Sequence, residues 1–349
     1  MIDRFTITKP DDWHLHVRDG DMMRAALPFT AAKFGRAIMM PNLIPPVTTT
    51  ADAVAYRKRL LAALPRGNKF EPLMTCYLTD DTDPDDVERG FMEKVFTGVK
   101  LYPANATTNS AAGVTDFRRI RRVLERMQRI GMPLLIHAES VNPEVDIFDR
   151  EAVFIEQIFE PWTREFPELR FIHEHLSSKV GCDFVRANAG KVGGTITPYH
   201  LELNRTDWLG WGNKPYMYCM PVIKTEKDRL ALRKAATGGE KSFFLGTDSA
   251  PHSIHKKLAV IGAAGLFNSP VAIETYAKVF DEEGALDKLE GFASLNGPAH
   301  YRLSPNKSTI TLERVSWIAP GEIKVPGPEE RVLIYRGGET IEWKVTQVS

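Results

Sequence analysis

The chain has 349 residues, and its 45 lysines and arginines are balanced by 45 aspartates and glutamates, which gives a formal net charge of zero. Because nucleic-acid binders need a surplus of basic residues, this balance disfavours a nucleic-acid partner. No apolar run approaches the roughly 20 residues that span a bilayer, and the first residues lack the apolar core of a signal peptide. The three cysteines are scattered without a CxxC pair. We therefore expect a soluble cytoplasmic protein with reduced thiols.

Short β-rich runs alternate with longer segments of helical periodicity through most of the chain. The predicted strands are 11–17, 35–41, 72–78, 97–102, 133–139, 170–176, 193–201 and 242–248. The predicted helices are 51–64, 83–94, 115–131, 150–166, 178–189, 225–236 and 271–283. This alternation predicts an α/β fold, a TIM (β/α)8 barrel of parallel strands covered by helices. An open doubly wound sheet would need a nucleotide-binding fingerprint, which we do not find.

Two of the predicted helices carry end signals. The segment 51–64 follows a possible N-cap, Thr50, and stops before Pro65. One face of 115–131 carries the apolar residues Phe117, Ile120, Leu124, Met127 and Ile130. Gly131 then stands where a helix C-cap is expected.

The last part of the chain differs from the rest, because it is punctuated by Pro and Gly and lacks long helical segments. We predict a catalytic barrel domain over 1–304 and a small C-terminal β appendage over 305–349, packed on the barrel because so short a segment makes a poor independent domain. The sequence RVLIYRGGETIEWKV predicts a hairpin that turns at Gly337 and Gly338.

Polar residues end most of the predicted strands, although strands of a parallel barrel should be apolar. These residues are His14, His16, Asn42, Lys100, His137, His175, His200 and Asp248. Barrel enzymes build their active sites at the C-terminal ends of the strands. A buried His or Lys without a partner is costly, so a set that converges on one mouth predicts a shared metal ion.

Two pairs of histidines share a spacing of two residues. His14 and His16 would point to one face of their strand, about 7 Å apart along it, which suits one ion; the alternative is a chance pair on a polar edge strand. By the same rule His173 and His175 share a face, and we favour His175 as the ligand because it lies nearer the strand end. His173 would then project into a lower layer of the barrel, or be the ligand itself if the strand ends earlier.

Lys100 and Asp248 are ambiguous by themselves. At the surface Lys100 would extend its ammonium group into water, but burial would lower its pKa and make the neutral amine nucleophilic. The amine could form a Schiff base, or react with carbon dioxide to give a carbamate able to bridge two cations, and the neighbouring histidines favour the carbamate. Asp248 could bind metal and accept a proton, or cap the following turn.

With these residues identified, the chain resembles the amidohydrolase superfamily and, within it, the short class II dihydroorotases. The matching motifs occur in the family's order between residue 11 and about 302: WHLHVRD, MMPNL, GVKLYPANATTNS, LLIHAE, EHLSS, ITPYHL, GTDSAPH and NGPAHY. The resemblance implies two zinc ions, one held by His14, His16 and Asp248 and the other by His137 and His175. Carboxylated Lys100 (N6-carboxylysine) would bridge the two ions together with a hydroxide.

The resemblance also implies how a substrate is held. Residues that match substrate contacts are Arg18, Asn42, His137, Met220, His252 and Ala264. Of these, Arg18, Asn42 and His252 match residues that bind the substrate carboxylate, and Met220 stands where a leucine is expected. Thr107 and Thr108 match a flexible loop that closes over the site, whereas His173 has no counterpart.

The implied reaction is the zinc-dependent, reversible cyclisation of N-carbamoyl-L-aspartate to L-dihydroorotate in pyrimidine synthesis, by a homodimer. Asp248 would act as general base and then general acid. One alternative is another cyclic amidohydrolase, such as a hydantoinase or allantoinase, but these usually build a β-sandwich from both chain ends, and an HxH at residue 14 leaves no room for its N-terminal part. The other alternative is a non-catalytic scaffold, which would typically have lost metal ligands.

Overall fold

The computed structural model describes residues 2–326 and 331–349, and its centre is a sheet of eight parallel strands in the order β2-β3-β4-β5-β6-β7-β8-β9. Their bounds are Asp12–Leu15, Arg36–Met39, Glu71–Tyr77, Phe96–Leu101, Leu134–Ile136, Phe171–His173, Val192–Ile196 and Phe243–Leu245. Just beyond β9, a parallel bridge from Leu15 to Ser249 joins the first strand to the last. The predicted TIM barrel is therefore confirmed, and each of its eight strands overlaps a predicted one.

The lower part of the barrel is filled by large side chains. This inner cluster contains Trp13, Ile38, Met40, Leu135, Ile172, Phe244 and Tyr301. The indole of Trp13 stacks on Tyr301 with ring centroids 4.4 Å apart, and an added Cβ on Gly297 would lie only 1.9 Å from Trp13 Nε1. Since the interior of such a barrel is a packed core and not a pore, the polar strand ends lie above a floor of apolar side chains.

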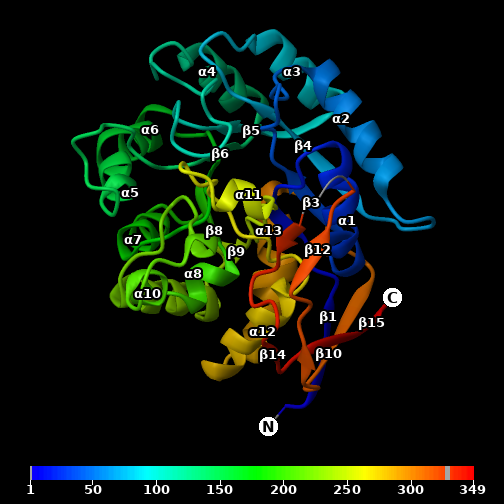
Figure 1. Cartoon of the computed structure of the whole chain (residues 1–349). Coiled ribbons are helices and arrows are strands. Elements are labelled where there is room, and N and C mark those ends of the chain that lie inside the picture. Colours follow the sequence, from blue (N-terminus) through cyan, green and yellow to red (C-terminus); the bar gives the residue numbers. More distant parts are fainter. Residues whose placement is uncertain (1, 327–330) are drawn as a thin grey trace.

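Helices cover the outside of the barrel (Figure 1). The main ones are α1 Gly20–Lys33, α2 Thr50–Ala63, α3 Pro84–Met92, α4 Arg121–Ile130, α5 Arg150–Phe154, α6 Glu160–Glu165, α7 Lys179–Ala187, α8 Pro198–Glu202, α9 Arg205–Leu209, α10 Glu226–Thr237, α11 Ile254–Lys257, α12 Ala272–Glu282 and α13 Asn296–Tyr301. A π-helical turn, Ile155–Phe159, joins α5 to α6. None of the helices in the described ranges is both long and apolar enough to cross a membrane.

The helix ends agree only in part with the sequence analysis. Gly131 ends α4 in the left-handed region with φ 71°, as predicted, but α4 starts at Arg121 rather than near 115. The N-cap of α2 is Thr49 and not Thr50, because the Thr49 hydroxyl accepts from Asp52 N in a capping box. Helix α1 was not predicted; it contains Pro28, which usually ends a helix.

Both chain ends contribute to the small sheets beside the barrel. Strand β1 (Arg4–Thr8) pairs antiparallel with β10 (Thr309–Glu313), which pairs with β15 (Lys344–Val348). The N-terminus thus contributes one strand of five residues to a three-stranded sheet. The division at residues 304 and 305 stays a prediction, and residues 327–330 of the appendage lie outside the described part.

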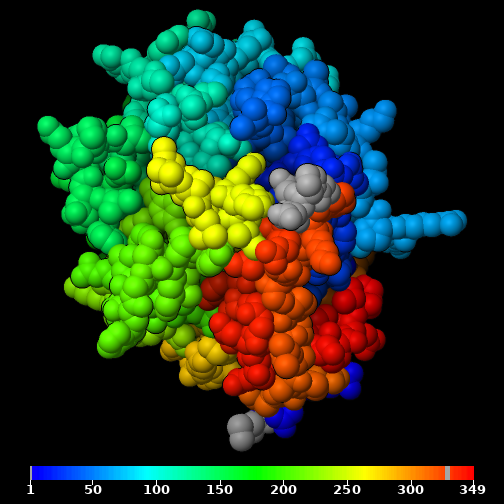
Figure 2. Space-filling model, in the orientation of Figure 1, coloured from blue at the N-terminus to red at the C-terminus, as the bar shows by residue number. Residues whose placement is uncertain are grey.

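The predicted hairpin at Gly337 and Gly338 is also wrong in its pairing. A turn does occur there, with φ 81° at Gly338. However, β13 (Arg331–Leu333) pairs with β12 (Glu322–Lys324), and β14 (Thr340–Ile341) pairs with β11 (Trp317–Ile318). Partners distant in sequence thus replace the local pairing. In Figure 2 the appendage, orange and red, lies against the yellow segment that contains α11, and Tyr335 N donates to Phe267 O at 2.8 Å.

Candidate metal centre

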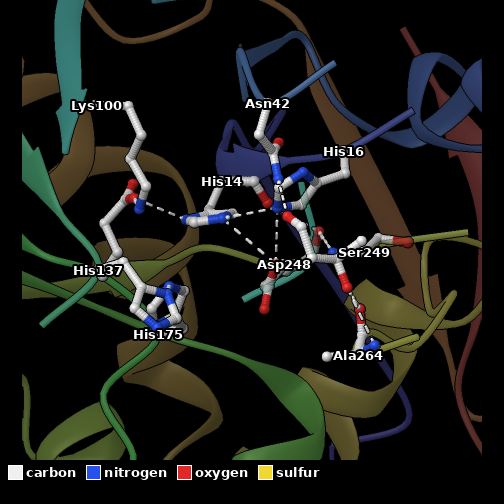
Figure 3. A network of polar contacts seen from close by, with 12 residues as sticks. His14, His16, Asn42, Lys100, His137, His175, Asp248, Ser249 and Ala264 are labelled. Atoms are coloured by element: carbon white, nitrogen blue, oxygen red, sulfur yellow. Dashed lines mark hydrogen bonds and ion pairs between the residues drawn. The ribbon is translucent and has the colours of Figure 1, made fainter. Parts of the chain in front are cut away.

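The carboxyl ends of the barrel strands surround a small, enclosed cavity. It is lined by His14, His16, Arg18, Asn42, Tyr102, Thr107, Thr108, His137, His175, Met220, Asp248, Ala250, Ala264 and Gly265. Figure 3 shows His14, His16 and Asp248 pointing toward one another, with His137 and His175 beside them. The structure thus brings together nearly all residues that the sequence indicated. His252 lies in the adjoining outer pocket, and Lys100 is buried next to the cavity.

One group of possible ligands comes from the two ends of the barrel sheet. His14 Nε2 and His16 Nε2 lie 3.2 Å apart, and Asp248 Oδ1 lies 3.3 Å from the first and 3.2 Å from the second. Burial lowers the pKa of His16 to about 3, so its imidazole is neutral and its lone pair is free to bind a cation. Burial by itself would raise the pKa of Asp248, but His14 and His16 lower it overall and keep it a carboxylate.

The second group consists of His137 and His175. His137 Nδ1 lies 3.2 Å from His175 Nε2, and burial holds the pKa of His175 well below its usual range. The other nitrogen of His137, Nε2, contacts Glu139 Oε2 at 2.8 Å. A carboxylate in that place fixes the ring orientation and the tautomer of a histidine ligand.

These donor sets fit divalent cations. Nitrogen ligands bind zinc at about 2.0–2.1 Å in a tetrahedral arrangement, which places two ligand atoms roughly 3.3 Å apart. The separations within both groups match that value. Imidazole nitrogens and a carboxylate oxygen are also the ligand types that zinc takes in proteins, so the donor chemistry supports metal binding. Within the described residues, two sets of three side chains could each hold an ion: His14, His16 and Asp248, and His14, Glu174 and His175.

Lys100 is the penultimate residue of β5 and is fully buried. Burial lowers its pKa, although the neighbouring Glu174 acts in the opposite direction. Its Nζ contacts Glu174 Oε2, and it lies 4.9 Å from the centroid of the Tyr102 ring. The surface role for Lys100 is therefore excluded, and a desolvated lysine beside the histidine groups is what carboxylation of its amine requires.

Sequence reasoning missed Glu174, which is completely buried. In addition to Lys100, its Oε2 contacts His14 Nδ1 at 3.0 Å. We expected His173 and His175 to share a face, and that expectation is wrong. His175 has φ 43°, which breaks the strand alternation and turns its ring into the cavity. His173 instead faces the helices, where its Nε2 lies 3.2 Å from Glu151 Oε1. The sequence signal for Glu174 was its place between two strand-end histidines.

His200 is a second correction, because it does not end a strand. Strand β8 stops at Ile196, and His200 belongs to α8. Its Nδ1 pairs with Thr197 Oγ1 at 2.9 Å and its Nε2 with Pro221 O at 3.1 Å. With both nitrogens used, His200 is a structural residue.

Arg18 and His252 form a polar pair at the outer edge of the cavity. Arg18 Nη2 lies 2.7 Å from His252 Nε2, and Arg18 Nε donates to Pro251 O at 3.3 Å. The left-handed backbone of Arg18, with φ 63°, turns its side chain toward this edge. A fixed guanidinium beside an imidazole is suited to binding a carboxylate.

The loop that carries Thr107 and Thr108 closes over the cavity. Asn42 Nδ2 donates to Thr108 O at 3.0 Å, and Ala264 N donates to Thr108 Oγ1 at 3.1 Å. Asn109 Nδ2 donates to Asn42 O at 3.1 Å. Asn42 and Ala264, both predicted substrate contacts, therefore hold the loop from two sides.

Comparison with known proteins agrees with this geometry. A family profile described as "Amidohydrolase family" matches residues 11–314. Dihydroorotases of Novosphingobium aromaticivorans and Ralstonia nicotianae are 53% and 54% identical to this chain, over 99% of each sequence. A crystal structure of dihydroorotase in complex with 5-fluoroorotic acid from Saccharomyces cerevisiae is 31% identical over 99% of both chains, with a TM-score of 0.91.

Two other solved structures differ in how similar their sequences are to this chain. The dihydroorotase of Campylobacter jejuni is 32% identical over 99% of both chains, with a TM-score of 0.90. An L-hydantoinase from Arthrobacter aurescens has a TM-score of 0.77 at 15% identity, over 99% of this chain and 89% of that one, and shows a shared fold only. The chain therefore belongs to the amidohydrolase family and, within it, to the dihydroorotases.

Proposed function

We propose that this protein catalyses the reversible cyclisation of N-carbamoyl-L-aspartate to L-dihydroorotate and water, a step of de novo pyrimidine synthesis. The observation that carries the proposal is the position of the Arg18–His252 pair, at the edge of the cavity that the histidine groups and Asp248 line. A substrate that is a cyclic amide with a carboxylate substituent needs the histidine groups and Asp248 for the reacting carbonyl, and the Arg18–His252 pair for recognition of the carboxylate. The full-length similarity to dihydroorotases supports the same substrate.

For the metal centre, we propose two zinc ions per subunit. His14, His16 and Asp248 would hold one ion and His137 with His175 the other, and Lys100 carboxylated on Nζ would bridge them. When bound, the ions would polarise the amide carbonyl and lower the pKa of a water molecule. The buried position of Lys100 beside these residues supports its modification.

Asp248 is the residue best placed to transfer protons. Its carboxylate lines the cavity beside His14 and His16, and these histidines keep its pKa low. In the hydrolytic direction it accepts a proton from the attacking water and then donates a proton to the leaving ring nitrogen. In the synthetic direction the same steps run in reverse.

Recognition of the substrate carboxylate falls to Arg18, Asn42 and His252. The planar guanidinium of Arg18 offers parallel donors to a carboxylate, so a ring without that group would leave a desolvated cation unpaired. Met220 and Ala264 line the apolar side of the cavity. Thr107 and Thr108 close the entrance, which excludes water during the reaction.

The proposal is tested by following the absorbance of L-dihydroorotate with zinc-replete protein, using hydantoin and allantoin as matched substrates. We expect turnover of dihydroorotate and at least 100-fold lower kcat/KM with the two analogues, since neither carries the carboxylate. A loss of roughly 3 kcal/mol in charge-assisted contacts to the carboxylate corresponds to a factor of this size. Comparable rates with all three rings would indicate a broader cyclic amidohydrolase. Absence of turnover together with far less than two equivalents of zinc would indicate a scaffold.

We also propose that the protein is a cytoplasmic homodimer, in keeping with the resemblance to class II dihydroorotases. Sedimentation velocity at micromolar concentration tests the assembly. A single species with the mass of one chain would contradict the dimer.

A further inference from the structure

A buried tyrosine contacts the proposed general base from the side opposite the histidines. Tyr199 lies on α8, has no exposed surface and donates its hydroxyl to Asp248 Oδ2 at 2.6 Å. The other carboxylate oxygen, Oδ1, faces His14 and His16. The two oxygens of Asp248 therefore have different partners.

The position of Tyr199 is itself well fixed. Strand β8 ends at Ile196, and the Thr197 side chain caps α8 by accepting from His200 N at 3.1 Å. The ring of Tyr199 is packed in a separate apolar cluster that joins the barrel to the C-terminal appendage. Its other buried members are Cys219, Ile223, Leu266, Val271, Ala319, Tyr335 and Ile341. A phenol held in this way is pre-organised and loses little entropy when it orients the carboxylate.

The backbone alone does not fix the carboxylate. Asp248 N donates to His14 O at 2.8 Å, and φ of 44° places the residue in the left-handed region. Rotation of the side chain about its last torsion is nevertheless broad for an aspartate. Within the described residues, Tyr199 is the hydrogen-bond donor to Oδ2.

We infer that Tyr199 is a positioning residue for Asp248: its hydroxyl holds Oδ2 so that Oδ1 faces His14 and His16 and the carboxylate stays aligned for proton transfer. The inference rests on the proposed function of Asp248. Without the hydroxyl, the carboxylate samples other rotations, and proton transfer suffers while binding of the substrate by Arg18 does not. We therefore expect kcat to fall while KM stays close to the parent value.

The experiment compares Tyr199→Phe with a matched control, Tyr276→Phe. Tyr276 is equally buried, and its hydroxyl donates to the main-chain oxygens of Ile196 at 2.7 Å and Gly246 at 3.4 Å rather than to a side chain of the site. Each variant loses one buried hydroxyl together with the hydrogen bonding of that hydroxyl. We measure kcat and KM for dihydroorotate, thermal stability, zinc content, and the visible absorption spectrum of the cobalt-substituted proteins.

We expect Tyr199→Phe to lower kcat roughly 10- to 100-fold, as loss of one hydrogen bond to a charged group does, with KM within about threefold and zinc content as in the parent. Its cobalt spectrum should also change, because Asp248 is a proposed ligand. Tyr276→Phe should lose similar stability but keep its kcat and its cobalt spectrum.

Three results would overturn the inference: parental kcat in Tyr199→Phe, an equal fall in kcat in both variants, or identical cobalt spectra of Tyr199→Phe and the parent. A parent protein without dihydroorotate turnover would instead contradict the proposed function. The cobalt spectra would still test the contact between Tyr199 and Asp248 in that case.

Discussion

Replacing Arg18 by lysine tests the recognition of the substrate carboxylate. Arg18 uses Nε for Pro251 O at 3.3 Å and Nη2 for His252 at 2.7 Å. A lysine keeps the positive charge but has a single nitrogen, so it cannot hold this position and also present parallel donors to a carboxylate. Loss of one charge-assisted hydrogen bond costs about 1.5–3 kcal/mol. We therefore expect kcat/KM for dihydroorotate to fall roughly 10- to 150-fold.

The assay is the initial rate of dihydroorotate hydrolysis, with zinc measured on the same samples. Arg59→Lys is the matched control, because Arg59 donates Nε and Nη2 to Asp19 at 3.0 and 2.7 Å and does not line the cavity. The control should keep kcat/KM within twofold, and both variants should keep their zinc. A value of kcat/KM in Arg18→Lys within twofold of the parent would refute the carboxylate-binding role.

Three further predictions concern proton transfer, the loop and stability. Asp248→Asn should lower kcat far more than it raises KM, and steady-state activity within a few-fold of the parent would show that another residue is the base. Replacing Thr107 and Thr108 by valine should lower kcat/KM about tenfold or more, with zinc unchanged, since the two hydrogen bonds between the Thr108 hydroxyl and Ala264 are lost; equal rates would contradict the closing role. Burial lowers the pKa of His200 and of His300 to about 4, so below about pH 6.5 the unfolded chain takes up protons that the folded protein does not. The free energy of unfolding should therefore fall between pH 6.5 and 4, by up to roughly 3 kcal/mol per histidine, and urea titrations that give the same value at pH 7 and 5 would contradict this.

Much of the site could be predicted because each strand joins an apolar run to a polar end. In TGVKLY and PLLIHAE, buried residues define the strand, and the carboxyl end then carries Lys100 or His137 to the mouth of the barrel. The closed order of the strands places these ends around one cavity. The proposed ligands could therefore be predicted from the sequence as one set, without knowledge of the distances between them.

What the sequence could not supply depends on the backbone and on partners far apart in the chain. The left-handed φ at His175 interrupts the alternation of side chains along the strand. For this reason the sequence did not indicate that Glu174 lies beside His14 or that His173 faces Glu151. The pairing of β1 with β10 joins residues about 300 positions apart, and no local pattern indicates it. The contact of Tyr199 with Asp248 likewise links α8 to the end of β9.

The account as a whole depends most on Lys100. In the proposed centre, neutral histidines would not offset the repulsion between two cations, and we proposed Lys100, as a carbamate, for the bridging anion. The decisive measurement is zinc content together with the ¹³C NMR signal of protein loaded in ¹³C-bicarbonate, on the parent and on Lys100→Ala. We predict a carbamate signal and two zinc equivalents in the parent, and a folded Lys100→Ala protein that loses the signal, most of its zinc and nearly all activity, part of which acetate or propionate added with zinc restores. Two zinc equivalents in Lys100→Ala, or a borohydride-trapped adduct of substrate on Lys100 in the parent, would contradict the bridging role.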